Sequence, residues 1–121
     1  MADEISVTFS LTVTNGTFKD SFAPGQLKID QTTQGSNSGV LSIGTTAETV
    51  AFTDITSEGL FLVQNLDASN FILLGPDSTG MVDFLKIKPG EFQFLRLKPA
   101  VTVKAKADTA ACKLFYILLD D

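Results

Sequence analysis

The feature that most constrains the fold is a strict alternation of apolar and polar side chains over residues 5–14. The apolar positions are Ile5, Val7, Phe9, Leu11 and Val13, with serine or threonine between them. Successive side chains of a β-strand point to opposite faces, so this spacing places all five on one face. β-Branched and aromatic residues favour strands. The pattern therefore predicts a half-buried strand, followed by a tight hairpin turn at Asn15-Gly16.

The rest of the chain predicts short strands separated by turn signals, and no stretch has the 3.6-residue period of a helix. We expect strands at about 26–33, 40–43, 49–52, 60–65, 71–74, 81–87, 92–97, 101–105 and 112–119, with polar loops at about 14–25 and 33–39. Nine or ten strands in 121 residues predict an all-β fold with minimal helix. The expected architecture is one domain over residues 1–121, a two-sheet antiparallel sandwich of jelly-roll type. An immunoglobulin-like Greek key is the alternative.

The composition excludes several kinds of catalytic site. The chain has no histidine and a single cysteine, Cys112. Within one subunit, this excludes His-based triads, His-ligated metal sites, Cys/His dyads and an intrachain disulfide. The loop Asp77-Ser78-Thr79-Gly80 has its glycine one residue too late for the Asp-Thr/Ser-Gly loop of retroviral-type aspartic proteases. We therefore expect no enzymatic activity and no cofactor.

Two oxygen-rich loops are candidates for a calcium site. They pair Asp54 with Glu58 and Asp67 with Asn70. Neither has the alternating ligand series of a dedicated calcium loop, and Asp and Asn side chains commonly cap turns through their own backbone. Turn capping is therefore the preferred interpretation, and we expect no metal.

Charge is distributed unevenly along an acidic chain with a formal net charge of −5. Residues 1–80 hold two cations and nine acids, whereas residues 81–121 hold seven cations and five acids. An acidic domain repels phosphate, so we expect no nucleic-acid partner. The segregation favours copies that meet acidic edge to basic edge, or a basic face on an acidic partner, although solvated strand faces give the same distribution.

The chain shows no secretory signal pattern, and no apolar run reaches the roughly 20 residues that cross a bilayer. We therefore expect synthesis in the cytoplasm and no membrane partner.

Several later strands are apolar on both faces. Apolar residues are consecutive over 60–63, 71–74 and 114–119, and in 92–97 two phenylalanines point one way while two leucines point the other. The second face of such a strand must be covered by a loop or by another subunit. The predicted loops are poor in apolar residues apart from Phe18 and Phe22, so we favour a subunit interface over internal cover. The candidate interface residues are Phe92, Phe94, Leu95, Arg96, Leu97, Phe115 and Ile117.

Three segments resemble small virion proteins of tailed bacteriophages: GLFLVQNLD at 59–67, ILLG at 72–75 and LKIKPGE at 85–91. The pattern in that family is an apolar strand ending in a "v-N-l-d" turn, an "i-l-G" strand, then "l-k-l-x-P-G-E" and a closing hairpin. The resemblance covers about half of the chain, roughly residues 59–119. Residues 1–58 match nothing that we can name.

This resemblance implies a jelly-roll component that decorates or cements a capsid as a dimer or trimer. It implies a location on the virion surface, with the protein itself and a major capsid protein as partners, and it brings no catalytic residues. Lys104 and Lys106, on the solvated face opposite Val103 and Ala105, are candidates for contact with an acidic shell. A tail or connector component and a carbohydrate-binding sandwich remain alternatives, although Tyr116 is the one residue of the Trp and Tyr type on which sugars usually stack.

Overall fold

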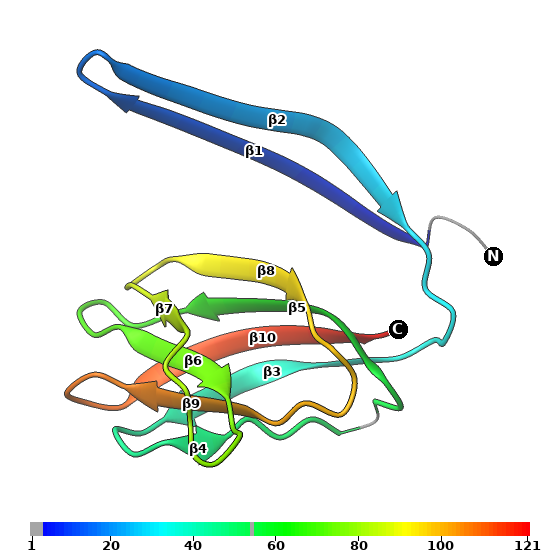
Figure 1. Cartoon of the computed structure of the whole chain (residues 1–121), viewed down its shortest axis with the longest axis vertical. Helices are drawn as coiled ribbons and strands as arrows, with labels where there is room; N and C mark the ends of the chain where they lie inside the picture. The colour runs from blue at the N-terminus through cyan, green and yellow to red at the C-terminus, as the bar shows by residue number, and fades with distance from the viewer. Residues whose placement is uncertain (1–3, 54) are drawn as a thin grey trace. The chain divides into compact units, whose positions relative to one another are not determined.

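The structure, a computed structural model, describes residues 4–53 and 55–121 and contains ten antiparallel strands and no helix within them (Figure 1). The all-β prediction is confirmed. The strands are β1 (Ile5–Asn15), β2 (Phe18–Ile29), β3 (Ser36–Ile43), β4 (Glu48–Thr49), β5 (Glu58–Asn65), β6 (Ile72–Pro76), β7 (Leu85–Ile87), β8 (Phe92–Arg96), β9 (Val103–Ala107) and β10 (Cys112–Asp120).

The chain divides into two compact units, Met1–Thr32 and Thr33–Asp121, where the sequence predicts one domain. The first unit holds β1 and β2, which form a two-stranded sheet of their own. We call this hairpin the arm. Residues 5–14 thus form the predicted strand, but that strand does not belong to either sheet of the second unit. The predicted loop at 14–25 is also wrong, because residues 18–22 and Gly25 pair with β1 as part of β2.

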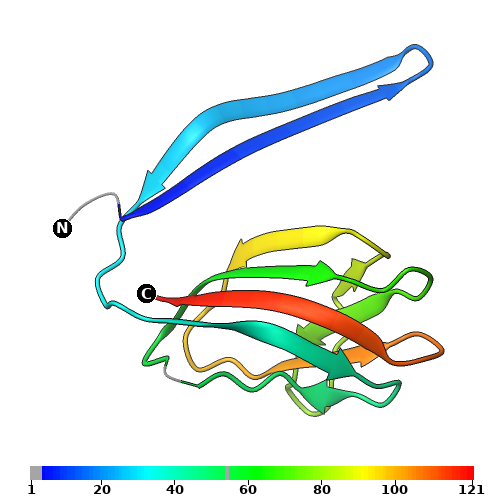
Figure 2. The same ribbon diagram turned by 180° about the vertical axis from the view of Figure 1, so that it is seen from behind.

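The second unit, which we call the sandwich, contains two four-stranded sheets with the orders β3-β10-β5-β8 and β4-β9-β6-β7 (Figure 2). The pairing is nested: β3 pairs with β10, β4 with β9, β5 with β8 and β6 with β7. One apolar core joins the inner faces of both sheets. Its largest fully buried side chains include Phe61, Leu114 and Leu118 of the first sheet and Ile72, Leu74 and Ile87 of the second.

The predicted loop at 33–39 is mostly strand, because β3 begins at Ser36 and pairs with β10 along its whole length. One of its polar side chains, that of Asn37, is hydrogen-bonded to residues outside β3. The Asn37 side chain accepts a hydrogen bond from the Tyr116 hydroxyl at 2.9 Å and donates one to Thr53 at 3.1 Å. Ladder pairing to an apolar neighbour therefore outweighs the low strand propensity of serine, asparagine and glycine.

Candidate functional site

The two strands of the arm place their apolar side chains on one face. The cross-strand pairs Ile5–Ile29, Val7–Leu27 and Leu11–Phe22 lie on this face, and the rings of Phe9 and Phe22 are 6.2 Å apart. We define the arm face by all the residues on that side: Ile5, Val7, Phe9, Leu11, Val13, Asn15, Phe18, Asp20, Phe22, Gly25, Leu27 and Ile29. The opposite side is polar, with Lys28 paired to Ser6 and Lys19 paired to Thr14.

A bulge makes this one-sided arrangement possible. Phe22 and Leu27 are five residues apart, which would place them on opposite faces of a regular strand. The register shifts between Phe9 and Leu11, so that Ser10 of β1 faces both Ala23 and Pro24 of β2. The extra residue restores the common face, and because it is unpaired in the ladder, a proline without an N–H group is tolerated there.

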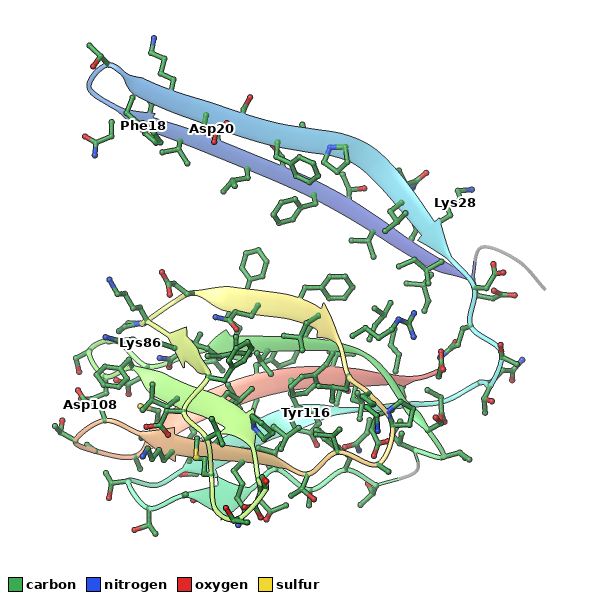
Figure 3. The ribbon with its side chains drawn as sticks, in the orientation of Figure 1. Phe18, Asp20, Lys28, Lys86, Asp108 and Tyr116 are labelled. Atoms are coloured by element: carbon green, nitrogen blue, oxygen red, sulfur yellow. The ribbon has the colours of Figure 1, made fainter. Side chains whose placement is uncertain are left out.

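The arm face is exposed to a degree that is unusual for a folded protein. Phe18, beside the turn in Figure 3, is 62% exposed, and Phe22 and Leu27 are exposed to more than half as well. A two-stranded hairpin is marginally stable in water because it has no second layer against which to bury side chains. Contiguous exposed apolar surface is characteristic of interaction sites, so the arm face is a candidate site.

The outer face of the β3-β10-β5-β8 sheet is a second apolar surface. The register aligns Val40, Phe115, Gln64 and Phe92 in one row across the four strands. The next row contains Ser38, Ile117, Leu62 and Phe94. We call this surface the apolar sheet face and define it by its exposed and half-buried apolar residues: Val40, Leu62, Phe92, Phe94, Phe115, Ile117 and Leu119. Val40, Phe92 and Phe94 are exposed, and the others are half-buried. Leu60, on the same side of β5 and paired with Arg96, is buried.

The candidate interface residues from the sequence fall on two sides of this sheet. Four of them belong to the apolar sheet face: Phe92, Phe94, Phe115 and Ile117. Arg96 follows Phe94 on the same side of β8, and its guanidinium forms an ion pair with Asp121 at 2.8 Å. The two leucines of the 92–97 segment lie on the inner side, as the alternation predicts. Both of them, Leu95 and Leu97, line an apolar cavity instead of an outer surface.

That cavity has a volume of about 110 Å³ and is lined only by apolar residues and glycine: Phe61, Leu74, Gly75, Pro76, Phe84, Leu85, Leu95, Leu97, Val101 and Val103. A ligand site usually adds a few convergent polar groups that fix orientation. The lining has no polar side chain that could activate or orient a substrate.

Lys104 and Lys106 lie on the outer face of the other sheet, and each approaches an acid. Lys106 is 3.3 Å from Asp83, and Lys104 is 4.0 Å from Asp77. Lys86 of β7 shares this face, because Leu73 of β6 pairs with both Lys106 and Lys86. The ammonium of Lys86 lies 4.3 Å from the centre of the Phe71 ring. We call these three lysines the lysine row.

Sequence reasoning missed the arm face, Lys86 and Lys113. The alternation over residues 5–14 indicates half of the arm face, whereas Phe18 and Phe22 fall in a predicted loop and carry no signal of a shared face. Lys113 lies two residues before Phe115 on β10, so the same alternation places it at the edge of the apolar sheet face.

The segments 59–67, 72–75 and 85–91 form β5, β6 and β7, and the first and the last of them continue into turns. The Asn65 side chain donates to the carbonyls of Asn70 at 2.8 Å and Ile87 at 3.0 Å, and its oxygen accepts the Asp67 N–H at 2.9 Å. The N–H of Gly90, whose φ is +79°, donates to the Asn65 carbonyl at 2.9 Å. These residues therefore connect the β5–β6 turn to the β7–β8 turn.

Turn capping, the interpretation preferred for Asp67 and Asn70, agrees with the hydrogen bonds. The Asp67 carboxylate accepts the backbone N–H groups of Asn70 at 2.7 Å and Ser69 at 3.0 Å. These two hydrogen bonds lower the pKa of Asp67 from its ordinary 3.8, and the bond from Asn70 has the larger effect. The other calcium candidate includes Asp54, which lies outside the described residues.

Two further observations bear on chemistry. Burial, followed by the charges of Asp67 and Asp108, raises the pKa of the Cys112 thiol, and a raised pKa makes a thiol a weaker nucleophile at neutral pH. Among residues 4–53 and 55–121, no three His, Cys, Asp or Glu side chains are grouped so that they could hold a metal ion. The same residues form no helix long and apolar enough to span a membrane.

No protein-family model matches the chain, and a search of curated proteins found no match.

Proposed function

We propose that the chain is a non-enzymatic structural protein of a tailed-bacteriophage virion that decorates or cements the capsid as an assembly of identical copies. The observation that carries this proposal is the arm, a hairpin whose large apolar residues share one face. Five of them are exposed: Phe9, Leu11, Phe18, Phe22 and Leu27. Covering such a face releases the free energy of apolar burial, about 25 cal/mol for each Å². An exposed apolar face of this kind suits a protein whose function is to bind other protein surfaces.

The strand order supports the jelly-roll part of the proposal. The eight strands of the sandwich are paired from the outside inwards, the first with the last and the fourth with the fifth, and they form two four-stranded sheets. A jelly roll is a double sheet of eight strands with this antiparallel character, and it recurs in viral capsid domains.

The lysine row is the surface we assign to the shell. Its three cations lie on the outer face of one sheet, and the two nearby acids leave a local excess of positive charge. The apolar sheet face lies on the outer side of the other sheet. Contact with the shell and contact between copies would therefore use opposite outer faces of the sandwich.

The test is association with purified particles of the phage that encodes the chain. The protein is expected to co-sediment with capsids in many copies, and reversal of charge in the Lys104→Glu/Lys106→Glu variant should lower the bound amount at least about tenfold. The matched control is Lys19→Glu/Lys28→Glu, which makes the same change in net charge on the polar side of the arm.

Three results would count against this function. Absence of the chain from purified particles, or a coding sequence outside any phage genome, would overturn it. A few copies located in the tail would favour the tail or connector alternative. Unchanged particle binding by a correctly folded Lys104→Glu/Lys106→Glu variant would show that the lysine row does not contact the shell.

A further inference from the structure

We infer that the arm of one copy packs its arm face against the apolar sheet face of a second copy, with Asp20 opposite Lys113. This inference rests on the proposed function, because it identifies the partner and the surface through which identical copies assemble. It assigns a role to exposed phenylalanines in both units, among them Phe18 and Phe22 of the arm and Phe92 and Phe94 of β8.

The two surfaces are alike in secondary structure and in chemistry. Each is the outer side of an antiparallel sheet, and two such faces pack about 10 Å apart with interdigitating side chains. Each is apolar along its centre: Leu11 pairs with Phe22 on the arm, while Leu62 lies between Ile117 and Phe94 on the sandwich. A third β layer over the sandwich would bury both faces at once.

The charges on the two surfaces are complementary. Asp20 is the one charged residue of the arm face. The charged side chains that border the apolar sheet face on β10 and β8 are the cations Lys113 and Arg96, and Arg96 is already paired to Asp121 at 2.8 Å. Lys113 makes no ion pair with the part of the chain that the structure describes. An acid on one surface therefore has a cation to meet on the other.

The spacing along the strands supports that pairing. Asp20 lies two residues from Phe22 on β2, and Lys113 lies two residues from Phe115 on β10. Two residues along a strand span about 6.6 Å, and both residues of each pair are on the same face. If Phe22 packs against Phe115, Asp20 can thus reach Lys113 when the strands run in the matching direction.

The buried area favours reciprocal contact between copies. The apolar sheet face spans four strands and about three rows of side chains, on the order of 300 Å², so one contact removes about 600 Å² from both partners together. Stable interfaces bury about 1,200–2,000 Å². Two copies that exchange arms reach the lower end of this range, whereas one arm contact alone falls short of it.

The first experiment uses complementary variants of the full chain in sedimentation velocity at several concentrations. The arm variant is Leu11→Glu/Phe22→Glu, and the face variant is Phe92→Glu/Phe94→Glu. The matched control is Val82→Glu/Phe84→Glu, which changes two exposed apolar residues outside both surfaces. Far-UV circular dichroism and urea denaturation establish that the sandwich of each variant is folded.

The parent and the control are expected to associate as concentration rises, and each of the other variants alone to remain monomeric. An equal mixture of the arm and face variants keeps one of the two contacts, because the intact arm of the face variant can pack on the intact face of the arm variant. The mixture should therefore associate more weakly than the parent but measurably more than either variant alone. A parent that is monomeric at every concentration would overturn the inference. So would a mixture that, at the highest concentration, associates no more than either variant alone.

The second experiment tests the charge pair. Asp20→Lys and Lys113→Asp should each weaken self-association about tenfold, and the double exchange should recover most of the loss. Additive losses in the double variant would overturn the pairing of these residues. Particle co-sedimentation is measured separately: particle binding without mixed dimers contradicts only this inference, whereas mixed dimers without particle binding contradict only the proposed function.

Discussion

At the scale of single residues, Asp120 is the buried carboxylate on which the start of β5 depends. It is 3% exposed, and its Oδ1 accepts the N–H groups of Ser57 at 2.8 Å and Thr56 at 3.0 Å. We expect Asp120→Ala to lower the free energy of unfolding by about 3 kcal/mol, because two amides lose their acceptor. Asp120→Asn keeps one oxygen and should lose less. Urea denaturation measures both, and equal stability of Asp120→Ala and the parent would contradict the assignment.

Asp67 predicts a dependence of stability on pH. Its folded-state pKa lies below the ordinary 3.8 because the N–H groups of Asn70 and Ser69 favour the ionised form. The resulting stabilisation is fully present above pH 3.8 and is lost as the pH falls through the lower, folded-state pKa. Asp67→Asn should remove this part of the acid sensitivity.

Two measurements check the Asp67 prediction. An NMR titration of the Asp67 carboxyl carbon in the folded protein should give a midpoint below 3.8. Urea denaturation at neutral and acidic pH should show a smaller loss of stability for Asp67→Asn than for the parent. A midpoint at or above 3.8 would mean that the two backbone hydrogen bonds do not form in solution.

At the scale of elements, the bulge of the arm allows a test of whether a continuous arm face is needed for self-association. One inserted or deleted residue changes which side chains share a face and leaves the composition almost unchanged. Deletion of Pro24 leaves one residue opposite Ser10 and preserves the arm face, so self-association should persist. Insertion of a serine after Phe9 also gives a regular ladder, but it turns Leu11 and Phe22 to the side opposite Phe9. Sedimentation velocity should then show a monomer for the insertion variant. Equal association of both variants would show that a continuous arm face is not required.

The elements that could be predicted from the sequence are those whose information is local. Alternation predicts which side chains share a face, so it separated Phe92 and Phe94 from Leu95 and Leu97 correctly. The residues predicted as loops at 18–25 and 36–39 are strand because their partners, β1 and β10, are strong strand formers. The sequence of a weak strand former does not show that it will pair with a strong strand elsewhere in the chain.

The same limit explains why the arm was predicted as part of the sandwich. A strand that is half-buried under a second sheet and a hairpin with one exposed apolar face have the same period of two. The pattern over residues 5–14 therefore fixes which face is apolar, but it does not identify what covers that face. Of the two candidate surfaces, the apolar sheet face could be predicted from its consecutive apolar residues. The arm face could not.

At the scale of the whole molecule, the core side chains all belong to the sandwich, and the arm has none of them. If copies assemble through the arm as proposed, we expect stability to come from the sandwich and the protection of the arm from solvent to come from a partner. Local stability in such a protein should be uneven, with the least protected amides in the element that binds the partner.

Amide hydrogen exchange measured at two protein concentrations tests this coupling. At concentrations where the parent is monomeric, amides of β1 and β2 should exchange much faster than those of β5 and β10, which lie at the centre of a four-stranded sheet. When copies associate, exchange in the arm should slow at least about tenfold, because opening must then also break the interface. Amides of β6 and β9, in the opposite sheet, provide the internal reference and should not change. Slow exchange in the arm at every concentration would mean that the arm is covered within a single copy.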